Sequence, residues 1–273
     1  MRSKILLLGS NGYLGARIYQ DLHMTLDIVP QYHSSPFWEN SIQLDITDPI
    51  AVEKTVKELK PDYIVHTANN GSGSWCESHP EEAKNLNEKA TSYIADVAMK
   101  HQSHLIYISS LAVLNPRNIY GKTKKNSEEI IQKSHGKWTI IRPSYIVGMS
   151  PNVTNDRPFN RILKAMSQDK PTYWDTSWEF QPTYIGHISQ VVERIVRRNI
   201  TGKIIPIFIK EVVTQYKLAK DILSNFKKEV QPKNDNLVIP LSIEKPRFFE
   251  ELNIKDMSYK EMITVITQEI KAI

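Results

Sequence analysis

A run of glycines near the N-terminus constrains the fold of this chain more than any other feature. The short apolar stretch Lys4–Leu8 leads directly into Gly9, Gly12 and Gly15, and a helix-like segment follows. In such a GxxGxxG loop, the first glycine permits a tight turn, the second admits a pyrophosphate, and the third lets the helix pack closely on the strand. We therefore expect a Rossmann domain that binds a nicotinamide dinucleotide. The alternative is a structural turn in another α/β protein.

The first half of the chain alternates short apolar runs with longer amphipathic segments. Strands that alternate with helices form right-handed βαβ units, and these build a parallel sheet covered on both faces. The predicted fold class is therefore α/β, with a doubly wound parallel sheet. Strands are expected near Lys4–Leu8, Leu26–Gln31, Tyr63–His66, His104–Ile108 and Trp138–Ile141, and helices near Tyr13–His23, Pro49–Leu59, Pro80–Lys100 and Ile119–Ser134.

After Gly148 the pattern loosens, because four prolines interrupt shorter elements. We expect an NAD(P)-binding Rossmann domain over residues 1–150 and a smaller α/β substrate-binding part over residues 151–273, interleaved with the first. In this second part, helices are expected near Pro158–Gln168, His187–Arg198, Thr214–Phe226 and Tyr259–Ile270, and a strand near Lys203–Ile209.

Charge and composition narrow the partners and the compartment. The net charge of +5 comes from 35 basic and 30 acidic residues spread along the chain, which does not suggest a nucleic-acid binder. The single cysteine, Cys76, excludes an internal disulfide and fits a reducing compartment. Because no apolar stretch resembles a signal peptide or a membrane span, we expect a cytoplasmic protein.

The end of the second strand-like run bears on the choice of cofactor. NAD sites place a carboxylate there for the ribose hydroxyls, but this chain reads VPQYHSS and has no acid. His33, Ser34 and Ser35 could instead donate hydrogen bonds to a 2′-phosphate, so we expect NADP(H), with NAD(H) as the alternative. Further on, Asp45 could accept a hydrogen bond from the adenine amino group, and Asp48 could cap the next helix.

A second motif, YxxxK, supplies candidate chemistry. On a helix, Tyr120 and Lys124 lie on one face, so both can point into a cleft. An ammonium group near a phenol lowers the tyrosine pKa and makes it a usable proton donor or acceptor. Ser109 and Ser110 follow a strand-like run, at the sheet edge where ligands bind. A glycine loop, a serine at the end of a strand and a YxxxK motif, in that order, form a much more specific pattern than YxxxK alone.

Over nearly its whole length, the chain resembles the extended short-chain dehydrogenase/reductases, and within them the dTDP-4-dehydrorhamnose reductase-like sugar-nucleotide reductases. The resembling stretches are GSNGYLG, LDITD, VHTAN, CESHPEEAKNLN, YISS, YGKTK, IIRPS, QPTYIGHISQ and KPRFFEELN. The resemblance implies that Ser110, Tyr120 and Lys124 are the catalytic residues. It favours Ser110 over Ser109, and it implies that Lys124 also holds the nicotinamide ribose and that Asn87 supports the local backbone. The cofactor-binding residues that we expect are Gly9, Asn11, Gly12, Tyr13, Leu14, His33, Ser34, Asp45, Ile46, Thr67, Ala68, Asn69, Tyr120 and Lys124.

The chain departs from these reductases between Ser110 and Tyr120. The segment Leu111–Ile119 is shorter than the reductase loop that lines the sugar pocket, and Asn115 and Pro116 make its turn. Hydride chemistry is compatible with this change, whereas the identity of the sugar is left open.

The sequence contains less evidence about substrate-binding and metal-binding residues. We expect Arg157 and Gln181 to contact the substrate, because Arg157 could reach a diphosphate and Gln181 falls in a family-like motif. Trp174 and Trp178 fit a core or a pocket wall. No metal site is expected, because the histidines lack a helical HxxxH pair and Cys76 has no cysteine partner.

The expected function is an NADP(H)-dependent reduction of a keto group on a nucleotide-linked deoxysugar. One alternative is an epimerase or dehydratase that uses NAD, although Leu111 stands where a dehydratase needs an acid. Another is a regulatory subunit that binds NADP without turnover, like that of methionine adenosyltransferase. A small-molecule substrate is the expected partner, with no nucleic acid or membrane, and the sequence also allows a homodimer.

Overall fold

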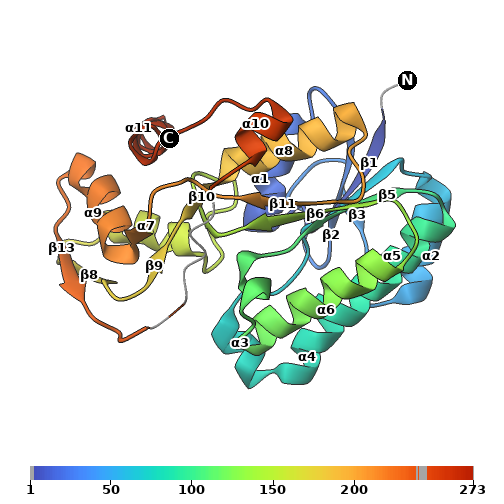
Figure 1. The fold of residues 1–273 in the computed structure, drawn as a ribbon, viewed down its shortest axis with the longest axis horizontal. Helices are drawn as coiled ribbons and strands as arrows, with labels where there is room; N and C mark the ends of the chain where they lie inside the picture. The colour runs from blue at the N-terminus through green and yellow to red at the C-terminus, as the bar shows by residue number, and fades with distance from the viewer. Residues whose placement is uncertain (1–2, 238, 240–244, 273) are drawn as a thin grey trace.

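A seven-stranded parallel sheet forms the centre of the molecule (Figure 1). The computed structural model describes residues 3–237, 239 and 245–272. The strand order is β3-β2-β1-β4-β5-β6-β11, so the chain runs outward from β1 in one direction and then from β4 in the other. A ligand-binding crevice is expected where the order reverses, at the carboxyl ends of β1 and β4. The strands are β1 (Lys4–Leu8), β2 (Asp27–Tyr32), β3 (Ile42–Gln43), β4 (Tyr63–His66), β5 (His104–Ile108), β6 (Trp138–Pro143) and β11 (Lys203–Ile207).

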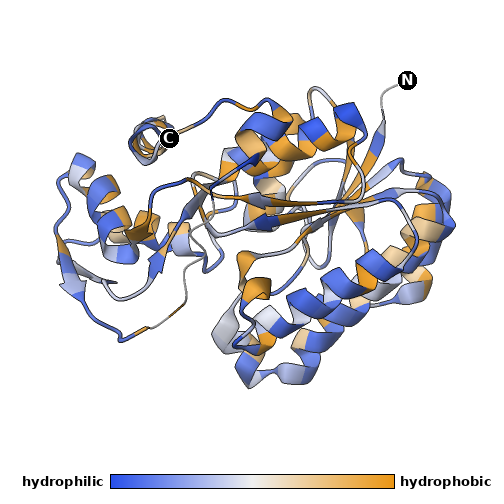
Figure 2. Ribbon diagram, in the orientation of Figure 1, coloured by the Kyte–Doolittle hydropathy of each residue, from blue (hydrophilic) through white to orange (hydrophobic). Residues whose placement is uncertain are grey.

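Alternating side chains of the sheet pack against helices on its two faces. In β1, Ile5 and Leu7 face one layer while Leu6 and Leu8 face the other, and all four are almost fully buried. Burial of such a side chain stabilises the fold by about 2 kcal/mol. Figure 2 shows the hydrophobic residues on the strands and on helix surfaces that face them. The first layer contains α1 (Tyr13–Leu22), α8 (Ile185–Arg198) and α10 (Phe248–Leu252), and the second contains α2 (Pro49–Leu59), α5 (Ala90–Lys100) and α6 (Ile119–Lys133).

The second half of the chain adds a smaller region with its own apolar cluster. Three two-stranded sheets, β10–β7, β12–β9 and β13–β8, lie beside α7, α9 and α11 (left in Figure 1). The elements are β7 (Tyr145–Val147), α7 (Pro158–Met166), β8 (Thr172–Asp175), β9 (Glu179–Phe180), β10 (Pro182–Tyr184), β12 (Val213–Thr214), α9 (Gln215–Leu223), the 3₁₀ turn η3 (Ser224–Phe226), β13 (Val230–Lys233) and α11 (Tyr259–Lys271).

The predicted fold class is confirmed: the sheet is parallel and doubly wound. β11, α8 and α10 come from the second half of the chain and pack onto the central sheet. The division at residue 150 stays a prediction. One expected helix, Pro80–Lys100, is interrupted, because a π-helical turn separates its two α-helical parts. Its parts are α4 (Pro80–Lys84), the π turn η1 (Asn85–Lys89) and α5; the first half also contains α3 (Gly73–Ser78) and the 3₁₀ turn η2 (Leu111–Leu114).

Within the described ranges, none of the helices combines the length and apolar character needed to cross a bilayer. The same residues include no group of three or more His, Cys, Asp or Glu side chains placed to hold a metal ion.

Candidate active site

A cleft of about 1680 Å³ lies at the carboxyl ends of the central strands, where the strand order reverses. Both halves of the chain line it. Ser34 and Lys124 are the two predicted site residues that do not line the cleft. The predicted residues that do are Gly9, Asn11, Gly12, Tyr13, Leu14, His33, Asp45, Ile46, Thr67, Ala68, Asn69, Ser110, Tyr120, Arg157 and Gln181.

The glycine loop is shaped by close approaches between backbone segments. Gly9 has a φ of +81°, and a Cβ atom there would lie 2.7 Å from the amide nitrogen of Ala68. A Cβ atom on Gly15 would lie 2.1 Å from the carbonyl oxygen of Gly9. No side chain therefore fits at Gly9 or Gly15. The absence of a side chain at Gly15 also lets α1 pack closely against the glycine loop.

The N-terminus of α1 opens toward the cleft without a side-chain cap. Gly12 is the N-cap residue, and the first turn of α1 contains no acidic side chain. By contrast, Asp48 caps α2 and accepts hydrogen bonds from the amides of Ile50 (2.9 Å) and Ala51 (3.1 Å). Uncapped N–H groups at a helix start attract anions, so this end of α1 suits a pyrophosphate.

Gln31 supports the glycine loop, and our sequence analysis did not assign it this role. The side chain is buried, and its Oε1 accepts a hydrogen bond from the amide of Gly9 at 2.8 Å. Its Nε2 donates to the carbonyl oxygen of Leu44, next to the predicted adenine contact Asp45. The Ser10 hydroxyl donates to the Gln31 carbonyl oxygen at 2.8 Å. A polar residue directly after the apolar run Ile28–Pro30 was the signal that could have identified it.

His33 is exposed where β2 meets the cleft. The imidazole of His33 is 73% exposed and its Nε2 lies 3.8 Å from the Asp45 carboxylate. Asp45 also accepts hydrogen bonds from the Thr47 hydroxyl (2.7 Å) and amide (2.9 Å), which lower the pKa of its carboxyl. Ser34 is exposed beside the cleft, and Asn11 donates to the carbonyl oxygen of Ser35.

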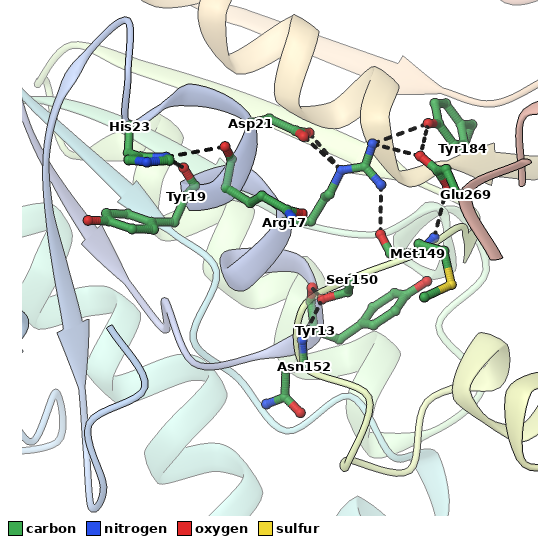
Figure 3. A network of polar contacts seen from close by, with 11 residues as sticks. Tyr13, Arg17, Tyr19, Asp21, His23, Met149, Ser150, Asn152, Tyr184 and Glu269 are labelled. Carbon is green, nitrogen blue, oxygen red and sulfur yellow. Dashed lines mark hydrogen bonds and ion pairs between the residues drawn. The ribbon is translucent and has the colours of Figure 1, made fainter. Parts of the chain in front are cut away.

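The loop after β7 is hydrogen-bonded to the glycine loop (Figure 3). The Tyr13 hydroxyl donates to the carbonyl oxygen of Gly148, and the Ser150 hydroxyl donates to the carbonyl oxygen of Tyr13 at 2.6 Å. Asn152 donates through its side chain to the carbonyl oxygen of Asn11. The backbone of the glycine loop is thus held by residues that lead into the second half of the chain.

A second set of contacts in Figure 3 joins α1 to the last helix, α11. The Arg17 guanidinium pairs with Asp21 at 2.8 Å and with Glu269 at 2.9 Å, and it donates to the carbonyl oxygen of Met149 at 2.7 Å. Glu269 also accepts hydrogen bonds from the Tyr184 hydroxyl (2.6 Å) and the Met149 amide (3.2 Å). The C-terminal helix therefore braces the loop that contacts the cofactor end of the cleft.

Ser110 and Tyr120 meet at the other end of the cleft. Ser110 follows β5 and begins η2, and its hydroxyl oxygen accepts a hydrogen bond from the amide of Ala112 at 3.1 Å. Desolvation raises the pKa of Tyr120, while a side-chain hydrogen bond with Ser110 and the charge of Arg157 lower it. The neighbouring Ser109 also lines the cleft, but its hydroxyl is buried and has no hydrogen-bond partner among the described residues. A tyrosine with a raised pKa remains protonated at neutral pH and can donate a proton.

Lys124 lies one turn after Tyr120 on α6, but it is buried behind the cleft. Its side chain is 1% exposed, and its Nζ donates to the carbonyl oxygen of Ile108 at 2.8 Å and lies 4.6 Å from the ring centre of Tyr107. Burial lowers the pKa of this amine to about 7, although the carboxylate of Glu128 opposes the shift. Its predicted action on Tyr120 stays a prediction.

Asn87, in the π turn, fixes the loop after β4. Its Oδ1 accepts from the amide of Asn70 at 2.9 Å and its Nδ2 donates to the carbonyl oxygen of the same residue at 3.0 Å. Its own carbonyl oxygen accepts from the hydroxyls of Thr91 (3.0 Å) and Ser127 (2.8 Å). The π turn therefore leaves a carbonyl available to α6, which carries Tyr120.

Two side chains hold the C-terminal end of the segment between Ser110 and Tyr120. Asn118 caps α6 by accepting from the amide of Gly121 at 2.8 Å, and Glu77 of α3 accepts from the amide of Ile119 at 2.6 Å. Glu77 was missed by the sequence analysis, because no local pattern pairs it with a segment 42 residues away.

The second half of the chain supplies the opposite wall. Trp178 and Phe180 pack at 5.5 Å between ring centres and both line the cleft, whereas Trp174 is in the apolar cluster. Gln181 is buried and donates to the carbonyl oxygen of Lys210 at 3.1 Å. Arg157 lies at the N-cap of α7 and lines the cleft near Tyr120.

Comparisons with known proteins agree with this geometry. Residues 3–250 match the family described as the RmlD substrate binding domain. The β subunit of methionine adenosyltransferase 2 from Bos taurus is 24% identical over 216 residues, or 71% of this chain and 62% of that protein. The dTDP-4-dehydrorhamnose reductase of Salmonella typhimurium is 29% identical over 183 residues, or 62% of this chain and 58% of that protein. The chain therefore spans less than two thirds of these relatives.

A crystal structure of a dTDP-4-dehydrorhamnose reductase from Bacillus anthracis, in complex with NADP, superposes with a TM-score of 0.84. It is 19% identical, and the match covers 100% of both chains. The resemblance inferred from the motifs is confirmed, and the chain belongs to the RmlD substrate-binding-domain family.

Proposed function

We propose that this protein is an NADP(H)-dependent reductase of a keto group on a nucleotide-linked deoxysugar. The observation that carries the proposal is one cleft that joins an uncapped glycine-loop helix start to the Ser110–Tyr120 pair. The dTDP-4-dehydrorhamnose reductase relatives support the reaction class, and the NADP in the Bacillus anthracis structure supports the cofactor.

The residues present fit a dinucleotide. A side chain on Gly9 or Gly15 would fill the space between backbone segments, and the start of α1 has no competing acid. Gly12, Tyr13 and Leu14 would bind the pyrophosphate. Asp45 and Ile46 would contact the adenine. The lack of an acid in the segment that ends at Ser35 favours NADP(H) over NAD(H). The other predicted contacts that line the cleft are Gly9, Asn11, His33, Thr67, Ala68 and Asn69; Ser34 is also a predicted contact but does not line the cleft.

In the proposed reaction, Tyr120 donates its hydroxyl proton to the oxygen of the substrate carbonyl. Ser110 donates a hydrogen bond to the same oxygen and stabilises the negative charge that develops there. The bound nicotinamide supplies the hydride. Lys124 would hold the nicotinamide ribose and adjust the ionisation of Tyr120. Residues 151–273 would form the substrate-binding part, with Arg157 and Gln181 among its contacts.

The replacement Tyr120→Phe tests the mechanism. We expect the variant to bind NADPH with the wild-type affinity and to lose at least about a hundredfold in turnover, because general acid catalysis typically contributes that much. NADPH fluorescence titration measures the binding, and absorbance at the nicotinamide band measures turnover with a panel of keto nucleotide sugars. Unchanged turnover would contradict the mechanism. The control Tyr173→Phe alters an exposed tyrosine outside the cleft and should change neither quantity.

The regulatory-subunit alternative has one specific support, the methionine adenosyltransferase β subunits among the relatives. It predicts stable co-purification with a partner protein and no NADPH oxidation with any keto nucleotide sugar. The proposed reductase predicts oxidation by the isolated chain.

A further inference from the structure

Arg157 carries a positive charge in the cleft, and no group among the described residues neutralises it by direct contact. Its side chain is half-buried, and among the described residues its guanidinium takes part in no hydrogen bond or ion pair. Arg161, one turn later on α7, binds both carboxylate oxygens of Asp156 at 2.8 and 2.7 Å. Two arginines on one helix therefore differ in whether they have a partner.

The backbone that carries Arg157 is fixed on the glycine loop. Its amide donates to the carbonyl oxygen of Asn155 at 2.9 Å. The buried Asn160 donates to the carbonyl oxygens of Asn155 (3.0 Å) and Asn152 (3.3 Å), and Asn152 donates to the carbonyl oxygen of Asn11. The position of Arg157 relative to the cofactor end of the cleft is thus set by a continuous series of hydrogen bonds.

The guanidinium of Arg157 lies over Gly71, in the loop that follows β4. A Cβ atom on Gly71 would lie 2.5 Å from Nη1 of Arg157 and 3.3 Å from Oδ1 of Asn69. Burial raises the pKa values of Tyr120 and Cys76, and the charge of Arg157 opposes this shift in both. The missing side chain of Gly71 therefore leaves room for a cation at the Tyr120 end of the cleft.

Two carboxylates that line the cleft, those of Glu77 and Asp156, already have other partners. Glu77 accepts from the amide of Ile119 at 2.6 Å, and Asp156 is paired with Arg161. A partly desolvated cation is favourable when an anion accompanies it, and a guanidinium binds a carboxylate through two parallel hydrogen bonds. A ligand oxyanion is the group that this position lacks.

We propose that Arg157 binds a carboxylate on the sugar unit of the substrate, close to the carbonyl that Tyr120 protonates. The substrate would then be an acidic nucleotide sugar. This inference rests on the proposed function and specifies its substrate class. A diphosphate is also an oxyanion. If Arg157 bound the diphosphate, its contribution to affinity would not depend on the sugar unit, and the experiment distinguishes a sugar carboxylate from a diphosphate on this basis.

Calorimetric titration in the presence of NADP⁺ tests the proposal without turnover. The probes are UDP-glucose and UDP-glucuronic acid, the same pair with thymidine in place of uridine, and the two free nucleoside diphosphates. In at least one pair, the wild type should bind the acid about tenfold more tightly than the neutral sugar. Arg157→Gln should abolish this preference and leave the affinity for the neutral sugar and the diphosphate within twofold.

Arg161→Gln is the matched control and should keep the preference for the acid. Arg157→Lys keeps the charge without the paired hydrogen bonds and should retain part of the preference, and NADP⁺ binding by each variant shows that its cofactor site is intact. Equal wild-type affinity for acid and neutral sugar in both pairs would overturn the proposal. So would an equal loss of affinity for the acid, the neutral sugar and the free diphosphate in Arg157→Gln. Either result leaves the proposed reductase function standing, because Tyr120→Phe tests that function separately.

Discussion

The two ends of the cleft are built by different means. At the cofactor end, backbone groups approach one another so closely that Gly9 and Gly15 have no room for a side chain. At the substrate end, side chains form the wall: Phe180 from the short strand β9, Trp178 from the turn before it, and Arg157 from the start of α7. Close backbone contacts allow only glycine at a position, whereas residues whose side chains form a wall can differ between proteins that bind different ligands. In the proposed function, the first end therefore selects the cofactor class and the second selects the substrate.

The largest effect is expected at Gly15. In Gly15→Ala, the new Cβ atom would meet the Gly9 carbonyl oxygen at 2.1 Å, and neither backbone segment can move freely. We expect the free energy of unfolding to fall by about 3 kcal/mol and NADPH binding to be lost. Chemical denaturation and fluorescence titration measure the two effects.

Gly202→Ala is the control, because a Cβ atom at Gly202 meets nothing within 4 Å although its φ is +68°. This variant should lower the free energy of unfolding by about 1 kcal/mol, from backbone strain alone, and leave NADPH binding unchanged. Wild-type NADPH affinity in Gly15→Ala would show that the loop does not form the cofactor site.

A smaller effect is expected where the C-terminal helix braces the cofactor loop. Glu269→Gln removes the charge that pairs with Arg17 and weakens the contacts with Met149 and Tyr184. Because this pair is partly buried, we expect a loss of about 2 kcal/mol in the free energy of unfolding, together with a higher KM for NADPH.

The exposed pair Arg197–Glu193 on α8 provides the comparison for that variant. Glu193→Gln should lower the free energy of unfolding by about 0.4 kcal/mol and leave the KM for NADPH unchanged. If the two variants behaved alike, the Arg17–Glu269 pair would have no special role in supporting the loop.

The smallest effect concerns cofactor preference. In His33→Asp, a carboxylate at the ribose end of the cleft would repel a 2′-phosphate, so the ratio of NADPH to NADH affinity should fall about tenfold, or about 1.4 kcal/mol. Ser34→Asp places the same charge at an exposed residue that does not line the cleft, and the ratio should change less. Equal changes in both variants would indicate a general charge effect instead of a contact at His33.

Local patterns predicted the elements around the glycine loop well because the determinants of these elements are local. The glycine spacing, the strand Tyr63–His66 and the helix Pro49–Leu59 have the bounds that the sequence analysis gave. The π turn within Pro80–Lys100 was not foreseen, because its stabilising contacts run from Asn87 to Asn70 and Ser127.

The substrate end was harder to predict because its contacts are distant in sequence. Glu77 meets the backbone 42 residues later, and Arg157 lies against Gly71, so neither contact leaves a periodic signal. The burial of Lys124 behind the cleft follows from the packing of α6 on the sheet, which the YxxxK spacing alone does not reveal.

The most direct test of the central claim follows the hydrogen that is transferred. NADPH carrying deuterium at the reactive C4 position is incubated with the protein and a keto nucleotide sugar, and the product is analysed by mass spectrometry and NMR. The account predicts one deuterium on the carbon that carried the carbonyl with the wild type, and almost none with Tyr120→Phe, which still binds NADPH. NADPH oxidation without deuterium in the sugar, or equal labelling by both proteins, would contradict it.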